Sequence, residues 1–156
     1  MLHHEADHRA NHSQPNQTTK KKERILVVDQ DALTCDFLAN IIKLLGCEFE
    51  IINSADEALE ILEKTAFDLL IADFHLPNSK QLLETSLQKH PQLQTICMIQ
   101  HRQIFFEALR LPGAAFVPKP FNFDDIVQKI HQAIHHKNLQ QIENDFRRLR
   151  QEFFRL

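Results

Sequence analysis

The chain has 156 residues, of which 43% are hydrophobic and 25% charged, and its formal net charge is −3. These values are typical of one soluble globular domain with short extensions. The longest uninterrupted apolar stretches, such as 25–28 and 69–72, are far shorter than the roughly 20 residues that span a bilayer, and no apolar signal-peptide core precedes them, so we expect neither membrane insertion nor secretion.

The central residues 25–136 carry 8 basic and 15 acidic side chains. This acidic balance disfavours direct nucleic-acid binding and favours the binding of cations. The three cysteines, Cys35, Cys47 and Cys97, are an odd number without a C-x-x-C spacing, which disfavours a disulfide framework or a zinc finger. We therefore expect a cytoplasmic location.

Residues 1–23 contain almost no large apolar side chains and are rich in histidine, so they are predicted to form a disordered tail. His4, His8 and His12 recur every four residues and would present a metal-binding face if the tail became helical. Nothing in the segment would stabilise such a short helix, so we interpret it as a solvated tail.

From Arg24 to His136 short apolar runs alternate with longer amphipathic stretches, which indicates a parallel sheet with helices on both faces. The five predicted strands are Ile25–Val28, Phe49–Ile52, Leu69–Ala72, Ile96–Ile99 and Ala115–Val117. The first and third are continuously apolar, as strands buried on both faces are.

Five helices are predicted to alternate with these strands. The first ends at Gly46, which suits a left-handed position after a helix, and the second begins with a capping box formed by Ser54 and Glu57. The helices are predicted at Ala32–Leu45, from Ser54 onward, at Ser79–Lys89, near Ile104–Leu111 and after Asn122. Only two glycines occur, so no glycine-rich loop is present to bind a nucleotide phosphate.

Polar side chains follow the ends of the predicted strands, where the carboxyl ends of a parallel sheet gather a binding site. Asp29 follows the first strand, Asp73 the third, Gln100 the fourth and Lys119 the fifth. Two carboxylates and one lysine form a small site that can hold a hard divalent cation and accept a phosphoryl group.

The chain resembles the response-regulator receiver domain of two-component signalling over residues 24–136. The matching segments are R-I-L-V-V-D at 24–29, D-L-L-I-A-D-F-H-L-P at 68–77 and F-V-P-K-P-F at 116–121. The resemblance implies a flavodoxin-like, doubly wound (βα)5 fold with a five-stranded parallel sheet. It also implies a signalling switch that is not an enzyme, with a histidine kinase or phosphotransfer protein and a downstream protein target as partners.

By the same resemblance, Asp73 is the phosphoacceptor and Asp29 is an acidic residue that reaches Mg²⁺. Lys119 would contact the phosphoryl oxygens, and His75 falls where the family offers a backbone carbonyl to the metal. The implied site therefore comprises Asp73 and Lys119 for phosphorylation and Asp29, Asp73 and His75 for Mg²⁺. The Lys119–Pro120 peptide bond is expected to be cis.

Four positions depart from, or complicate, the family pattern. Gln30 replaces a second metal-binding acid, so we expect Mg²⁺ binding to be weakened or lost. Asp31 would replace that acid only if the loop bulged, and we prefer to interpret it as a helix cap. Gln100 stands at the position of the switch Ser or Thr, and Phe116 at the aromatic switch position, where it is alternatively a core residue.

Two functions remain open at this point. The first is a receiver that accepts a phosphoryl group on Asp73 and signals through protein contacts. The alternative is a pseudo-receiver, a phosphorylation-independent interaction and dimerisation module, which Gln30 and Gln100 favour. A haloacid-type phosphatase would use the D-x-D string at 29–31, but the D-x-x-x-P at Asp73 and the small size disfavour it.

Residues 137–156 are predicted to continue the last helix, because neither proline nor glycine interrupts it. Large apolar residues recur there at spacings of 3, 4, 3, 4 and 3, the heptad pattern of a coiled coil. They are Leu139, Ile142, Phe146, Leu149, Phe153 and Leu156. We expect a homodimer through residues 139–156; folding back onto the domain is less favoured because turn residues are absent.

The segment also resembles the linker helix that follows nitrogen-regulatory-type receivers. Neither an ATPase nor a helix-turn-helix segment follows it in the sequence. We therefore expect an atypical stand-alone member of the receiver family, with an extended C-terminal helix.

Overall fold

The computed structural model describes residues 21–100, 110–111 and 113–153. Residues 1–20 of the predicted tail, most of the predicted helix near 104–111, and the last three residues of the C-terminal segment lie outside this range. Within it, no helix combines the length and the apolar character needed to cross a membrane.

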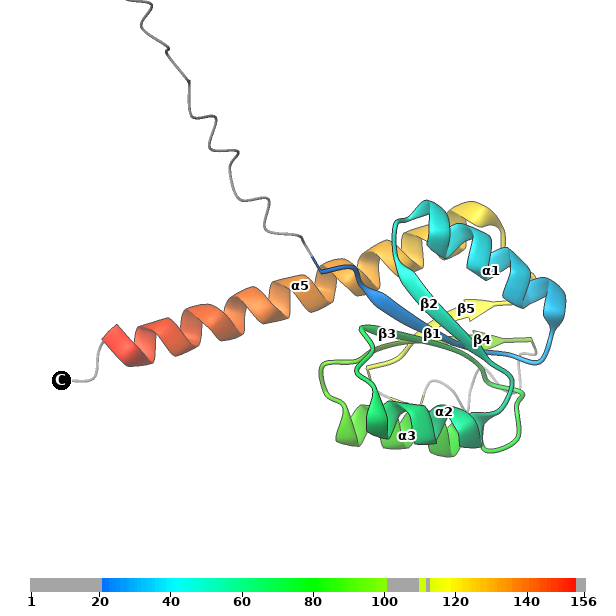
Figure 1. The fold of residues 1–156 in the computed structure, drawn as a ribbon, viewed down its shortest axis with the longest axis horizontal. Helices are drawn as coiled ribbons and strands as arrows, with labels where there is room; N and C mark the ends of the chain where they lie inside the picture. The colour runs from blue at the N-terminus through cyan, green and yellow to red at the C-terminus, as the bar shows by residue number, and fades with distance from the viewer. Residues whose placement is uncertain (1–20, 101–109, 112, 154–156) are drawn as a thin grey trace, which may run out of the picture.

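Five parallel strands form one sheet in the order β2-β1-β3-β4-β5 (Figure 1). Their bounds are β1 at Arg24–Val28, β2 at Glu48–Ile52, β3 at Leu69–Asp73, β4 at Gln94–Ile99 and β5 at Ala115–Pro118. The predicted flavodoxin-like, five-stranded parallel sheet is thereby confirmed, with each strand within two residues of its expected bounds. Most of the helix predicted between β4 and β5 lies outside the described residues.

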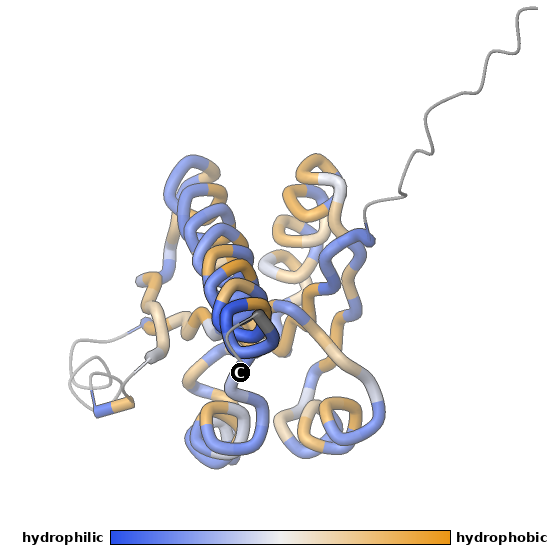
Figure 2. Tube along the Cα trace, turned by 90° about the vertical axis from the view of Figure 1, so that its left-hand side faces the viewer, coloured by the Kyte–Doolittle hydropathy of each residue, from blue (hydrophilic) through white to orange (hydrophobic). Residues whose placement is uncertain are grey.

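Helices cover both faces of the sheet, as Figure 2 shows along the strand direction. Helices α2 (Ala55–Lys64) and α3 (Ser79–Lys89) lie on one face, and α1 (Ala32–Leu44) and α5 (Phe123–Phe153) on the other (Figures 1 and 2). Successive strand residues point to opposite faces of the sheet and pack into separate hydrophobic cores. Leu26 packs towards α2 and α3, whereas Ile25 packs towards α1 and α5.

The sequence signals for the helix ends act as predicted. Ser54 accepts the backbone N–H of Glu57 at 3.1 Å and caps α2. Gly46 follows α1 with a φ of 74°, the left-handed conformation that glycine adopts without a Cβ clash. Helix α3 occupies the predicted range Ser79–Lys89 and ends before Pro91.

Helix α5 is a single helix of 31 residues that packs on the sheet with its first half and runs out of the domain with its second half (Figure 1). Ile126 and Ile130 are fully buried against the sheet, whereas Leu139, Ile142, Phe146 and Leu149 are exposed. Through residue 153 the helix does not fold back onto its own domain.

Candidate functional site

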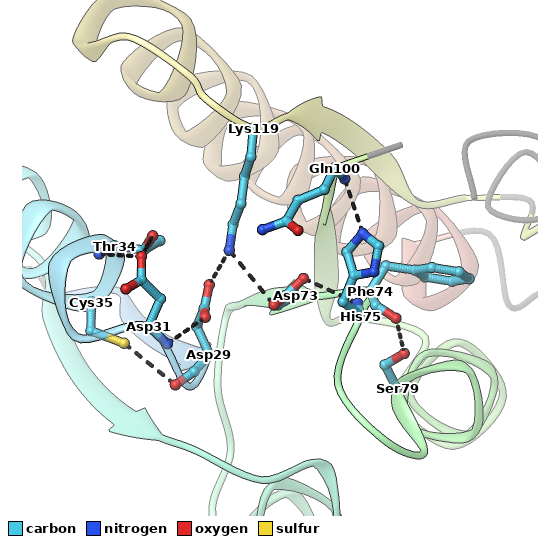
Figure 3. A network of polar contacts seen from close by, with 10 residues as sticks. All are labelled: Asp29, Asp31, Thr34, Cys35, Asp73, Phe74, His75, Ser79, Gln100 and Lys119. Carbon is cyan, nitrogen blue, oxygen red and sulfur yellow. Dashed lines mark hydrogen bonds and ion pairs between the residues drawn. The ribbon is translucent and has the colours of Figure 1, made fainter. Parts of the chain in front are cut away.

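The topology brings three charged side chains together at the carboxyl end of the sheet (Figure 3). Asp29 directly follows β1, Asp73 ends the neighbouring β3, and Lys119 directly follows β5. The parallel pairing of Val28 with Ala72 places the two aspartates at equivalent heights on adjacent strands. The structure thus brings together the three residues that the sequence placed at strand ends.

Lys119 lies between the two carboxylates and closer to one of them. Its Nζ is 2.6 Å from Asp29 Oδ2 and 3.6 Å from Asp73 Oδ2. The side chain of Asp29 is 1% exposed, and those of Asp73 and Lys119 are each 10% exposed. Because a buried charge without a partner is strongly destabilising, the lysine stabilises the fold as the charge partner of both carboxylates.

The second oxygen of each carboxylate holds the loop that follows its strand. Asp29 Oδ1 accepts the backbone N–H of Asp31 at 2.9 Å, and Asp73 Oδ1 accepts that of His75 at 3.1 Å. Each aspartate therefore has one oxygen fixed by its own loop and one directed towards Lys119 (Figure 3).

The position of Lys119 is set by the backbone around it. Its N–H donates to the carbonyl of Ile99 at 2.7 Å, which extends the pairing of β5 with β4. The following peptide bond, Lys119–Pro120, is cis, as the resemblance implied. The side chain points from this turn towards Asp29 and Asp73 (Figure 3).

The imidazole of His75 links the loops after β3 and β4, a contact that the sequence did not predict. Its Nε2 accepts the backbone N–H of Gln100 at 3.3 Å (Figure 3). Position is the one signal for such a contact in the sequence, since His75 and Gln100 lie just after the neighbouring strands β3 and β4. The site is therefore bounded on one side by the His75 ring and by the exposed Gln100.

Asp31 caps α1, which is the interpretation preferred from the sequence. Its Oδ2 accepts the hydroxyl of Thr34 at 2.6 Å and the backbone N–H of Thr34 at 3.2 Å. These hydrogen bonds, the hydroxyl first, lower the pKa of Asp31 below its ordinary value. Gln30, at the position of the missing family acid, is exposed.

The donors at the site fit a Mg²⁺ ion that keeps several of its waters. Among the described residues, no cluster of three or more His, Cys, Asp and Glu side chains is arranged to hold a metal. Asp29 and Asp73 are two hard oxygen ligands, and Mg²⁺ is commonly bound through one or two carboxylates and water. The His75 carbonyl is the further oxygen that the resemblance assigns to the metal.

A hollow of about 520 Å³ adjoins Lys119 and is lined by both polar and apolar side chains. Its apolar wall comes from α1 and from the turn after β5: Leu33 is 80% exposed, Phe37 is 38% exposed, and the rings of Phe37 and Phe121 lie 5.9 Å apart. This wall was not predicted from the sequence, although Leu33 and Phe37 stand four residues apart and so share one helix face.

The position of Phe116 is consistent with both of its predicted roles, the aromatic switch residue and a core residue. Phe116 is half-buried and packs against the core on the α2 and α3 side, and it pairs in register with Cys97 of β4. Burial, with a smaller contribution from the charge of Asp73, raises the pKa of Cys97 to about 12. That thiol is therefore a neutral side chain in the core.

Comparison with known proteins gives consistent matches across the described domain. A family profile described as the response regulator receiver domain matches residues 25–131. The chain is 31% identical over 102 residues to the response regulator protein FleR of Pseudomonas aeruginosa, covering 63% of this chain and 22% of that protein. It is 30% identical over 121 residues to the DNA-binding transcriptional regulator NtrC of Escherichia coli, covering 75% and 26%.

Solved structures show the same similarity. A receiver domain protein described as CheY-like from Methanospirillum hungatei superposes with a TM-score of 0.70 at 29% identity, covering 77% of this chain and 99% of that one. NtrX from Brucella abortus superposes with a TM-score of 0.73 at 27% identity, covering 81% and 29%. The chain spans about a quarter of the length of the curated relatives that it matches.

Proposed function

Because the chain belongs to the response regulator receiver family of two-component signalling, we propose that it accepts a phosphoryl group on Asp73 and signals through protein contacts. The observation that carries the proposal is the convergence of the buried Asp73, Asp29 and Lys119 at one end of the sheet. This makes the chain a switch whose covalent state changes, and not an enzyme that turns over a metabolite.

The proposed step is the transfer of one phosphoryl group to a carboxylate oxygen of Asp73. That oxygen forms a bond to phosphorus while the bond from phosphorus to the donor nitrogen or oxygen breaks, and the bonding electrons leave with the donor group. Lys119 Nζ, 3.6 Å from Asp73 Oδ2, stabilises the added negative charge. Asp29 holds the lysine in place through the shorter contact.

Mg²⁺, when bound, would neutralise charge on the transferring phosphoryl oxygens. Asp29 and Asp73 would hold it through their carboxylates and His75 through its carbonyl. Because Gln30 provides no charge, we propose that this ion is held more weakly than it would be by a third carboxylate.

Receiver domains interact with histidine kinases and with downstream effectors. We propose a histidine kinase or a phosphotransfer protein as the phosphodonor for this chain. The exposed Leu33 and Phe37 beside the hollow at Lys119 provide an apolar surface next to the phosphoacceptor, on which a donor protein can pack. The free thiols of Cys35, Cys47 and Cys97 are compatible with the proposed cytoplasmic location.

Phosphorylation is tested by incubating the full chain with a small acyl-phosphate donor and Mg²⁺ and measuring intact mass. We expect the mass of one added phosphoryl group in the parent protein. The Asp73→Asn variant, which keeps the size of the side chain, should gain none. The added mass should be lost on treatment with hydroxylamine, which cleaves an acyl phosphate and leaves a phosphoserine intact.

Asp31→Asn is the matched control, because it removes a nearby carboxylate while asparagine still caps a helix well. This variant should gain the same mass as the parent. Absence of any mass gain in the parent across donor and Mg²⁺ concentrations would exclude the phosphoacceptor role. That result would favour the pseudo-receiver, whose supporting features are Gln30 and Gln100.

A further inference from the structure

The part of α5 that leaves the domain carries a row of exposed apolar side chains. Leu139 is 46% exposed, Ile142 50%, Phe146 67% and Leu149 49%. They repeat at spacings of 3, 4 and 3 residues and so occupy the a and d positions of two heptads. We call these four residues the α5 stripe.

The α5 stripe lies on the side of the helix opposite to the sheet. Each of its residues follows an inward-facing residue by nine positions, which is two and a half turns of an α-helix. The inward residues are Ile130 and Ala133, which pack in the core, and Lys137 and Gln140, which contact residues at the amino ends of β3 and β4. The receiver of the same chain therefore cannot cover the stripe without a break in α5.

Two polar contacts fix the direction in which α5 leaves the domain. Lys137 Nζ forms an ion pair with Asp68 Oδ1, just before β3, and both side chains are less than a quarter exposed. Gln140 accepts a hydrogen bond from Gln94 Nε2, at the start of β4, at 3.5 Å. Because the helix is held at its exit and is continuous through residue 153, a partner helix would meet a surface that is already ordered.

We propose that the α5 stripe binds the stripe of a second copy of this chain in a parallel, two-fold symmetric coiled coil. In a parallel pair, the g position of one helix lies beside the e position of the next heptad in its partner. Asp145 is at g and Arg150 is at e. Two symmetric pairs of opposite charge, Asp145 with Arg150 of the second copy, would therefore flank the seam.

An antiparallel pair of the same helices gains no net charge attraction. Facing Phe146 with Leu149 in that orientation places Asp145 near Glu152 of the second copy, a like-charge pair, and Glu143 near Arg150, an opposite-charge pair. The two contacts offset each other, whereas the flanking pairs of the parallel arrangement are both attractive. The pattern also fits a second copy better than an unrelated helix, since one sequence supplies both the apolar row and the complementary charges.

The first test measures the mass of the full chain by sedimentation equilibrium from low to several hundred micromolar. We expect a reversible monomer–dimer equilibrium in the micromolar range. The double variant Phe146→Asp and Leu149→Asp should weaken it by at least about a hundredfold, because four carboxylates would then lie on the seam. Thermal unfolding of the receiver, measured at a concentration where the parent is monomeric, should be unchanged, since both positions lie beyond the sheet.

The matched control adds the same two charges to the opposite face of the same helix. Asn144→Asp and Gln151→Asp stand at f positions, away from the seam, and should dimerise like the parent. A parent protein that stays monomeric at several hundred micromolar would overturn the proposal, and so would a control that loses the dimer together with the seam variant. The Asp73→Asn variant should dimerise like the parent, so failure of the phosphoacceptor proposal leaves this test intact.

A charge exchange tests the orientation. In the parallel dimer, Asp145→Arg and Arg150→Asp should each weaken the homodimer, by about tenfold or less, because each creates two like-charge contacts. An equimolar mixture of the two single variants restores both opposite-charge pairs and should form the heterodimer in preference to either homodimer. A tighter homodimer in Asp145→Arg would instead indicate the antiparallel arrangement and overturn the parallel one.

Discussion

The substitution Gln30→Asp tests whether the loop after β1 faces a bound cation. It adds one negative charge at an exposed position beside Asp29. Two unit charges 4 Å apart in water interact by about 1 kcal/mol, so a divalent ion and one new carboxylate gain about 2 kcal/mol at that distance. Isothermal titration with Mg²⁺ should therefore show tighter binding, by at least about tenfold, which corresponds to 1.4 kcal/mol.

Gln30→Asn is the matched control, because asparagine has the size of aspartate without its charge. It should bind Mg²⁺ no more tightly than the parent protein. Equal affinity in Gln30→Asp and Gln30→Asn would show that residue 30 does not face the ion, and the reasoning that assigns weak binding to Gln30 would be refuted. Raising the ionic strength should reduce the gain, as it does for any exposed charge pair.

Two further predictions concern stability. Lys119→Met leaves the carboxylate of Asp29, which is 1% exposed, without its ion-pair partner. Urea unfolding should show a free energy of unfolding that is lower by about 3–5 kcal/mol, and adding Asp29→Asn should partly restore it. An unchanged urea midpoint would contradict the role given to the lysine. The lowered pKa of Asp31 means that its ionised cap stabilises the fold fully above the unfolded value of 3.8 and progressively less as the pH falls through the lower folded value. The unfolding midpoints of the parent and of Asp31→Asn should therefore respond differently to pH only below about pH 4. If the two proteins differed in pH response only near neutral pH, the assignment of Asp31 as an ionised helix cap would be contradicted.

The sheet could be predicted from the sequence because its buried strands leave a direct signal. Leu69–Ala72 is apolar on both faces, as a central parallel strand must be, and β3 lies there. The pattern missed the start of β4, because Gln94 and Thr95 are polar although they pair with Leu69 and Leu70. Strand pairing is made by the backbone, so a polar strand end leaves no trace in an apolar pattern.

The positions of Asp29, Asp73 and Lys119 could likewise be predicted, since topology alone places strand ends together. The distances between their charged atoms could not be predicted. That Lys119 lies nearer to Asp29 than to Asp73 depends on the turn at Pro120 and on the hydrogen bonds of two loops. The contacts of Lys137 with Asp68 and of His75 with Gln100 also join segments far apart in the sequence, which periodicity does not report.

Helix α5 is the described element that runs from the end of the domain that holds Asp73 to the proposed seam. Its first turn follows the Lys119–Pro120 turn, whereas Lys137 and Gln140 fix it at the other end of the sheet, one strand length or about 16 Å away. Linkage is reciprocal: if phosphorylation of Asp73 changes the dimerisation constant by some factor, dimerisation changes the equilibrium constant for phosphorylation by the same factor. A dimer constant that is the same in phosphorylated and unphosphorylated protein would mean that assembly is constitutive, and the phosphorylation signal would then have to be read at the surface of α1 and the β5 turn.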